Sequence, residues 1–512
     1  MSEDLAQENP NENLVEINNI NEANNNNDNN NDNDNNPIQD EEPKKVNSFS
    51  TILSIWNTMI GSSTVSLPFN VYNSGIIPAI FLSAIYGLIC FYTCKVYIDL
   101  GSKHPDFCIT IEKYFQKVFG NKIAKIGKFI QILFCILITL GGLLIYFLII
   151  NQNLYPISCL ILNKIGLEIN GLDLTPEFNR FSIVYLGMIL CIILFPLTIK
   201  KDVGFLVKLS SYGIYFISIL IIFVIGNGIA SLINTHFSFD YIKNRPNSEE
   251  RHLKLFGENP ALFAGTLSLG YFCHTAVLPV LKSNKNQENN TRDLFLGYCF
   301  VCLTFSLCGI LGYIGFSGKN FDVDFKDNWF MFFEYDNYYI LFFRLLNVFQ
   351  LISVFPILVY VVRLQIFNSV YDNDYPSRKL VIIYGCSIMV ICLLVLYFCY
   401  NFLGKLLGII GATTSLFLIY TLPPTAKMVH HYLEIKGDGI DNDNDNESNC
   451  IVGDNNGIND ENVIKRIKSE YNKANYKDIL YFIGQSLIII VGVATVVFQF
   501  VPINFFGITL ED

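Results

Sequence analysis

Eleven apolar stretches, each about as long as a membrane-spanning helix, constrain this chain more than any other feature of its sequence. Backbone groups in lipid must pair within their own segment, and the stretches lack the apolar–polar alternation of barrel strands. We therefore expect an all-α integral membrane protein with eleven transmembrane helices. The stretches are 49–69, 76–98, 124–150, 181–199, 209–233, 259–281, 294–316, 338–362, 380–400, 404–423 and 479–501.

Charge is distributed unevenly along the chain. Only 16% of the residues are charged, against about a quarter in soluble domains. Residues 1–43 hold 12 acidic and no basic residues, and residues 437–462 hold eight acidic and no basic residues. The net charge of −10 therefore comes from two acidic segments, and the rest of the chain is basic overall. This distribution argues against a nucleic-acid-binding domain, and the expected surroundings are the lipid bilayer.

The loops and tails give an expected topology. Lys and Arg concentrate in the loops on one side, for example at Lys103, Lys200 and Arg378, which predicts a cytosolic N-terminus and a lumenal C-terminus. The N-terminal segment is rich in Asn and has no aromatic residue, so it cannot form a packed core. The expected organisation is a disordered cytosolic tail over 1–47, a transmembrane domain over 48–501 with a disordered cytosolic loop over about 434–465, and a lumenal tail over 502–512.

Polar and small residues interrupt the first apolar stretch. It reads Asn57-Thr58-Met59-Ile60-Gly61-Ser62-Ser63 and then reaches Pro68. One interpretation is a small-residue face that lets helices pack closely. The other is a helix unwound near Gly61, whose free amides and carbonyls line a cavity. We expect Gly61 at the turn, because glycine tolerates positive φ and leaves room for a ligand.

The sixth apolar stretch contains a second set of such residues, from Gly265 to Gly270, followed by His274 and Pro279. Interruptions in the first and sixth helices are typical of a five-plus-five inverted repeat and indicate a transporter site at the membrane midplane. A half-helix N-terminus would face a substrate carboxylate there. The sequence has no phosphate-binding loop, hydrolase elbow or zinc-spaced Cys/His cluster, which argues against an enzyme.

The expected spans have no Asp or Glu at mid-depth, so a coupling ion would be held by carbonyl and hydroxyl oxygens. This chemistry favours Na⁺ over a proton. His274 is the one candidate for carrying a proton, and its alternative role is packing. Ser353, close to Pro356, either hydrogen-bonds back to its own helix or acts as a cation ligand, and both interpretations stay open.

These segments resemble the amino acid/auxin permease superfamily. Within it they are similar to the sodium-coupled neutral amino acid transporter family, most of all to its lysosomal, arginine-sensing member. The resemblance covers residues 48–423 and 478–501. It rests on Asn57 to Ser63, on His104-Pro105-Asp106, on the stretch from Leu281 to Asp293, and on Pro356 to Gln365.

The resemblance implies an eleven-helix inverted-repeat fold with broken helices 1 and 6 and one extra C-terminal helix. It implies a multi-pass protein of a lysosomal, late endosomal or vacuolar membrane, with a substrate of the arginine, leucine or glutamine class. By the same resemblance, Asn57 and Ser353 would hold sodium. The residues implied to bind the amino acid are Thr58, Met59, Ile60, Gly61, Ser62 and Ser63.

Two features depart from the family pattern. The family member engages the Rag GTPase–Ragulator complex through an aromatic-bearing tail, whereas residues 1–48 contain no aromatic residue, which speaks against that partner. Its lumenal disulfide joins two loops. Here Cys159 is present in an expected lumenal loop, but residues 234–258 contain no second cysteine.

The sequence therefore predicts a secondary amino acid transporter that exports amino acids to the cytosol, with Na⁺ as the coupling ion and no other cofactor. Two alternatives stay open: a membrane sensor or scaffold for TORC1-type nutrient signalling with little net flux, and a proton-coupled carrier.

Overall fold

The structure, a computed structural model, describes most of the expected transmembrane domain. The described residues are 46–101, 107–167, 169, 171, 173–178, 180–199, 212–234, 237–240, 251–317, 327–333, 336–371, 377–436 and 476–501. The predicted tails lie outside these residues, apart from Val46 and Asn47. The predicted loop over 434–465 begins no earlier than residue 437, because helix α15 (Leu422–Lys436) continues to that point, and the rest lies outside the described residues.

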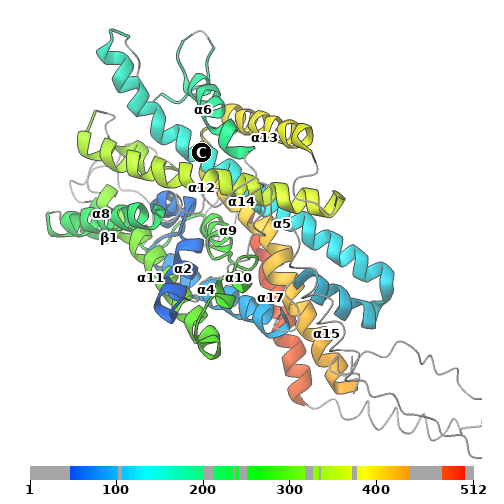
Figure 1. Cartoon of the computed structure of the whole chain (residues 1–512). Helices are drawn as coiled ribbons and strands as arrows, with labels where there is room; N and C mark the ends of the chain where they lie inside the picture. The colour runs from blue at the N-terminus through cyan, green and yellow to red at the C-terminus, as the bar shows by residue number, and fades with distance from the viewer. Residues whose placement is uncertain are drawn as a thin grey trace, which may run out of the picture. The chain divides into compact units, whose positions relative to one another are not determined.

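The described residues are mainly helical (Figure 1). Eight of the helices are long and apolar enough to cross a membrane, and two shorter ones, α6 and α9, are also apolar. Besides α15, the α-helices of the described residues are α2 (Ser48–Met59), α3 (Leu67–Ser74), α4 (Ile76–Gly101), α5 (Phe107–Lys164), α6 (Ile183–Thr198), α8 (Gly213–Asn234), α9 (Pro260–Gly270), α10 (Val277–Lys282), α11 (Asn290–Ser317), α12 (Tyr338–Tyr371), α13 (Arg378–Cys399), α14 (Leu403–Ser415) and α17 (Tyr476–Phe500). The short turns are the 3₁₀ helices η1 (Ser62–Val65), η2 (Gln287–Asn289) and η3 (Trp329–Phe332) and the π-helix η4 (Leu416–Thr421).

Every predicted apolar stretch falls on a helix or on a run of adjoining helices. The first falls on α2, η1 and α3, the sixth on α9 and α10, and the tenth on α14, η4 and α15. The helical membrane-protein class is therefore confirmed. The count of eleven spans and the inverted repeat remain predictions.

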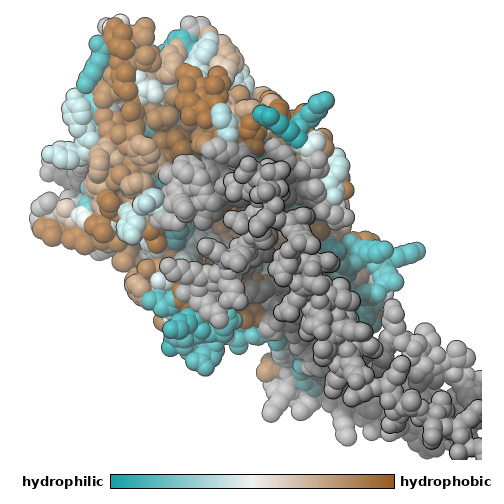
Figure 2. Space-filling model, viewed as in Figure 1, coloured by the Kyte–Doolittle hydropathy of each residue, from teal (hydrophilic) through white to brown (hydrophobic). Residues whose placement is uncertain are grey.

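The outer faces of the helices carry large apolar side chains (Figure 2). Ile192 of α6 is 75% exposed, Ile222 of α8 is 69% exposed and Phe398 of α13 is 65% exposed. A water-soluble protein rarely leaves so many such residues in contact with solvent. These faces suit contact with lipid.

Helix α5 is longer than predicted and reverses direction. Gly120 has φ +80°, outside the helical region, and divides the element. Lys128 and Glu112 are 16 positions apart yet form an ion pair of 2.8 Å, whereas a straight helix would separate them by about 24 Å. The segment before Gly120 therefore folds back on the one after it. Cys159, expected in a lumenal loop, instead lies inside this helix and is buried, because the helix continues to Lys164.

The all-α prediction needs one correction. A short parallel pair of strands, β1 (Phe237–Asp240) and β2 (Arg251–Lys254), lies between α8 and α9. Beyond β2, the backbone at Leu255 and Gly257 bonds to the turn after α3: Ile77 N donates to Leu255 O at 3.0 Å and Gly257 N to Ser74 O at 2.9 Å. The strand propensity of a sequence does not reveal such a pair, because strand pairing depends on the tertiary context.

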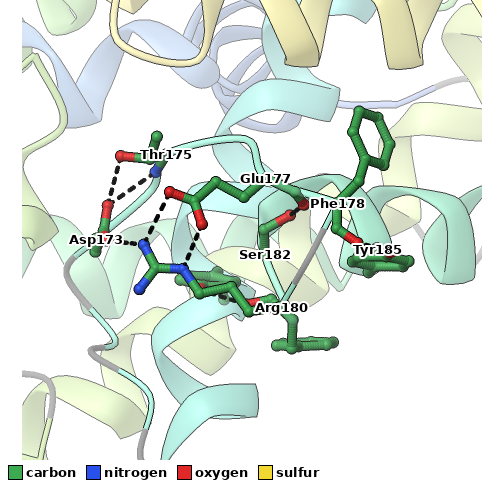
Figure 3. A network of polar contacts seen from close by, with 9 residues as sticks. Asp173, Thr175, Glu177, Phe178, Arg180, Ser182 and Tyr185 are labelled. Carbon is green, nitrogen blue, oxygen red and sulfur yellow. Dashed lines mark hydrogen bonds and ion pairs between the residues drawn. The ribbon is translucent and has the colours of Figure 1, made fainter.

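The connection between α5 and α6 is held by an ion-pair network (Figure 3). Arg180 contacts Asp173 at 2.6 Å and Glu177 at 2.8 Å. The hydroxyl of Thr175, and to a smaller extent Arg180, lowers the pKa of the Asp173 carboxyl. This carboxyl therefore stays charged, and paired with Arg180, to a lower pH than an ordinary aspartate. Ser182, at the start of α6, donates its hydroxyl to the Glu177 carbonyl at 2.5 Å.

Glycines form the crossing between α9 and α14. A Cβ at Gly411 of α14 would overlap the carbonyl oxygen of Gly265 in α9, and a Cβ at Gly265 would overlap that of Gly408. The sequence predicted an interruption in the stretch Gly265–Gly270. This stretch is helical throughout, and α9 ends at Gly270. Its small residues let two backbones touch, as in other membrane helix pairs. Helix α9 also packs against α3, α4 and α17 (Figure 1).

Candidate functional site

The interruption predicted in the first span is present. Helix α2 ends at Met59, Ile60 is extended with ψ 110°, and the chain then makes the η1 turn before α3. Pro68, near the start of α3, cannot donate a backbone hydrogen bond to the turn before it. Helical bonding stops at Ile60 N, which still donates to Trp56 O at 3.0 Å. The broken backbone runs from Ile60 to Ser66.

Two amides at the break have no acceptor among the described residues. The backbone N–H groups of Gly61 and Ser63 donate to no acceptor in that part of the chain. Bonding resumes at Thr64 N, which donates to Gly61 O at 3.3 Å. Amides in this position can donate to an anionic group such as a carboxylate.

The predicted substrate residues divide into two groups at this break. Thr58 and Met59 are the last two residues of α2 and are not unwound. The Thr58 hydroxyl donates to Ser54 O at 2.7 Å and its side chain is exposed, so it is satisfied within its own helix. Ile60, Gly61 and Ser63 lie in the broken stretch, with Ile60 and Ser63 buried.

Gly61 lies against a residue that the sequence analysis missed. A Cβ on Gly61 would lie 2.5 Å from the hydroxyl oxygen of Tyr146 in α5. The reason for a glycine here differs from the expected one, because its φ is −152° and not positive. Close approach of Tyr146, and not backbone handedness, excludes a side chain. The only sequence signal was a lone hydroxyl in the apolar run Leu143 to Ile150.

The second interruption follows Gly270. Helix α9 ends there, Tyr271 N donates back to Leu267 O at 2.8 Å, and α10 begins at Val277. His274 lies within this break and is buried, with its Nε2 3.0 Å from the Thr93 hydroxyl of α4. The Thr93 hydroxyl also lies within hydrogen-bond distance of two carbonyls of its own helix, and either tautomer of His274 fits the contact. His274 Nδ1 has no hydrogen-bond partner among the described residues.

A small apolar cavity adjoins the first break. Thr64 and Val65 of η1 line it, together with residues of α8 and α11. Trp329 of η3 also lines it, and the space is about that of one water molecule. The cavity is too small for an amino acid in this conformation.

The turn that carries Trp329 is tied down by buried amides. Asn328 donates to Gln152 Oε1 at 2.9 Å and to Asn153 Oδ1 at 3.1 Å, both in α5. Arg344 of α12, fully buried, donates to Phe330 O at 2.6 Å. These bonds tie η3 to α5 and α12.

The two residues predicted to hold sodium lie on different helices. Asn57 is half-buried in α2, which packs mainly against α11. The Ser353 hydroxyl donates to Gln350 O at 2.7 Å, within α12, and lies 3.6 Å from the position of a Cβ on Gly213 in α8. The structure thus shows the local hydrogen bond of the first interpretation, and the contacts described here do not join Ser353 to Asn57.

Comparisons with known proteins place the chain among transporters. It is 25% identical over 425 residues to a sodium-coupled neutral amino acid transporter 9 homolog of Caenorhabditis elegans, covering 74% of this chain and 68% of that protein. It is 26% identical over 439 residues to neutral amino acid transporter 9 of Danio rerio, covering 76% of each. Vacuolar amino acid transporter 2 of Saccharomyces cerevisiae is 22% identical over 402 residues, covering 76% of this chain and 78% of that protein.

Among solved structures, the chain is similar to Mhp1, a nucleobase-cation-symport-1 family transporter. The TM-score is 0.48 at 12% identity, covering 91% of this chain and 95% of that one. A score this low bears on no detail of the site.

The family is shown by the sequence itself. Residues 44–437 match the family described as transmembrane amino acid transporter protein. The resemblance predicted from the sequence is thereby confirmed, including the similarity to neutral amino acid transporter 9 proteins. The chain belongs to the transmembrane amino acid transporter family, within the amino acid/auxin permease superfamily.

Proposed function

We propose that this protein moves amino acids across an endolysosomal or vacuolar membrane by secondary active transport. The observation that carries the proposal is the pair of free amides at Gly61 and Ser63, in the broken stretch that lies against Tyr146. An α-carboxylate can accept hydrogen bonds from these amides. Carbonyls freed at the same break can accept from the α-ammonium group.

A site that binds the α-amino and α-carboxylate groups does not by itself determine which side chain the substrate carries. The names of the relatives support a neutral amino acid, and the yeast relative supports a vacuolar membrane. We propose a cytosolic N-terminus, a lumenal C-terminus and net flow toward the cytosol, in keeping with the distribution of Lys and Arg. The alternative is a sensor that binds an amino acid with little flux. A transport assay distinguishes this sensor from a transporter.

Coupling to Na⁺ is the second part of the proposal. Pro356 has no N–H group, so the carbonyl of Ile352, four residues earlier, lacks its helical donor. This carbonyl and the adjacent Ser353 hydroxyl provide oxygens of the kind that Na⁺ binds. The C. elegans relative is named as sodium-coupled, which supports the same ion.

A proton is the competing coupling ion, and one observation favours it. His274 is buried in the second break with Nδ1 unpaired among the described residues. Imidazole can take up a proton at physiological pH, so this nitrogen could accept one during the cycle.

Uptake by purified protein in proteoliposomes tests these proposals. We expect uptake of labelled neutral amino acids to rise with an inward Na⁺ gradient and to fall when choline replaces Na⁺. Ser353→Ala should weaken the dependence on Na⁺, and His274→Ala should leave it intact. Binding without uptake would support the sensor. Uptake that ignores Na⁺, follows pH and is lost in His274→Ala would support the proton-coupled carrier and contradict Na⁺ coupling.

A further inference from the structure

The stretch from Leu281 to Asp293, which carried much of the family resemblance, takes no part in the proposed site. It follows α10, which is the half of the broken sixth helix beyond His274. It lies beside the start of α2, which is the half of the broken first helix before Gly61 (Figure 1). The segment therefore joins the ends of the two half-helices on one side of the molecule, called here the Val46 side.

Backbone pairing joins these two ends directly. Val46 N donates to Ser283 O at 2.8 Å, and Lys285 N donates to Val46 O at 2.7 Å. This is a short parallel bridge between Val46 and Asn284. Val46 precedes Asn47, whose side chain accepts from Ser50 N at 2.8 Å and so caps α2. A single residue, Asn47, therefore separates the bridge from the first residue of α2.

A buried side chain holds the other strand of the bridge in place. Asn284 is fully buried and uses its amide completely. Its Nδ2 donates to Asn290 Oδ1 at 2.9 Å and to Asp293 Oδ2 at 3.0 Å, and its Oδ1 accepts from Asn286 N at 3.2 Å. Both Asn290 and Asp293 lie in the first turn of α11. Asn284 thus links α10, α11 and the entry to α2.

The partner of Asn284 is a buried carboxylate, which strengthens the link. Asp293 is fully buried, and its second oxygen accepts from Arg292 Nε at 3.1 Å and Nη2 at 2.9 Å. Hydrogen bonds to a charged group are stronger than those between neutral groups. Removing Asn284 would leave a buried carboxylate oxygen without its donor, which is costly. The α2 helix also packs closely on α11, where a Cβ at Gly297 would lie 2.7 Å from Ile55.

We infer that Asn284 and Asp293 are positioning residues that hold α2, α10 and the start of α11 together as one clasp, and that this clasp keeps the Val46 side of the transport path closed. Neither residue touches the proposed substrate site. The inference rests on the proposed function, because a gate has meaning only if substrate passes. Loosening the clasp favours the state that is open on the Val46 side and depletes the state that is open on the opposite side.

The first measurement concerns the clasp itself and needs no transport. We expect Asn284→Ala to speed hydrogen exchange at the amides of Val46 and Lys285 and along α2 in purified, folded protein. The matched control is Asn286→Ala, which makes the same change two positions away at an exposed side chain and keeps the bridge. Unchanged exchange in Asn284→Ala would overturn the inference, whether or not the protein transports amino acids.

The second measurement concerns the gate. In vesicles sorted by orientation with an N-terminal tag, Asn284→Ala should raise the KM for substrate added on the side opposite Val46 by about three- to tenfold. The KM from the Val46 side should fall or stay the same. A purely structural defect would change both values in the same direction. Combining Asn284→Asp with Asp293→Asn restores a donor–acceptor pair and should return both values toward wild type.

The two proposals fail in distinguishable ways. If wild-type protein transports no amino acid but the exchange result holds, the clasp stands and the proposed function does not. Faster exchange together with symmetric KM changes would contradict the gating role while leaving transport intact. Normal KM values in Asn284→Ala, together with normal hydrogen exchange, would contradict the clasp and leave the proposed transport function standing.

Discussion

Gly61→Val is expected to reduce uptake per folded molecule to less than about a tenth of wild type. A Cβ at this position would already lie 2.5 Å from the Tyr146 hydroxyl, and valine adds two further methyl groups. The contact is with the end of a side chain, so Tyr146 can move aside and the fold survives. Tyr146 then moves away from the break, and the new methyl groups cover the free amides of Gly61 and Ser63. Uptake divided by the amount of detergent-stable protein measures the effect.

The matched control for this variant is Gly142→Val, in the same helix as Tyr146. A Cβ at Gly142 meets no atom within 4 Å, so this change adds the same bulk in open space. We expect it to leave uptake near the wild-type level. If Gly61→Val lowered the folded yield while the surviving protein transported normally, Gly61 would be a packing residue and the broken stretch would not be the substrate site.

Gly411→Val is expected to have the opposite profile, with a large loss of folded protein. Its Cβ would overlap the Gly265 carbonyl oxygen and lie 3.0 Å from Leu269 Cβ, so α9 and α14 would have to separate. Backbone cannot move aside as a tyrosine side chain can. Overpacking of a well-packed interior typically costs about 1–3 kcal/mol, and backbone contact places this site at the upper end. The melting temperature in detergent measures the effect.

Gly484→Val in α17 controls for the added bulk, because a Cβ at Gly484 meets nothing within 4 Å. Its melting temperature should match wild type. A Gly411→Val protein with a normal melting temperature would show that α9 and α14 do not pack as the structure has them. Together, Gly61 and Gly411 separate a glycine kept for a ligand from one kept for packing.

The sequence was a good guide wherever a property belongs to one segment. Apolar length gave the helices, and the cluster from Asn57 to Ser63 followed by Pro68 gave the break in the first of them. Both depend on local chemistry: satisfaction of the backbone in lipid and the missing N–H of proline.

The sequence was a poor guide wherever a property depends on a distant partner. In the sixth span, Gly265 resembles a residue of a break, yet it lies inside α9 and packs on Gly408, and the break begins only after Gly270. A stripe of small residues serves either purpose, and only the neighbouring helix decides which. The same limit applies to Tyr146, which matters because the fold places it at Gly61. Gly120 shows the limit for topology, since one glycine among 34 gives no sign that the chain reverses there.

Asn57 and Ser353 were both assigned to sodium from the resemblance. The structure shows a local hydrogen bond for Ser353 and no contact with Asn57 among those described. Their assignment to sodium therefore stays a proposal, to be decided by the dependence of Ser353→Ala on Na⁺.

We propose that the amides of Gly61 and Ser63 bind the carboxylate of an amino acid that the protein carries. Competition for uptake tests this proposal, using a transported amino acid, its amide and the amine that lacks the carboxyl group. The three share a side chain and differ only in the group that the amides would bind. We expect the free amino acid to compete and both derivatives to fail at ten times its concentration, since about tenfold corresponds to roughly 1.4 kcal/mol of lost binding. Equal competition by the amide or the amine would contradict the claim.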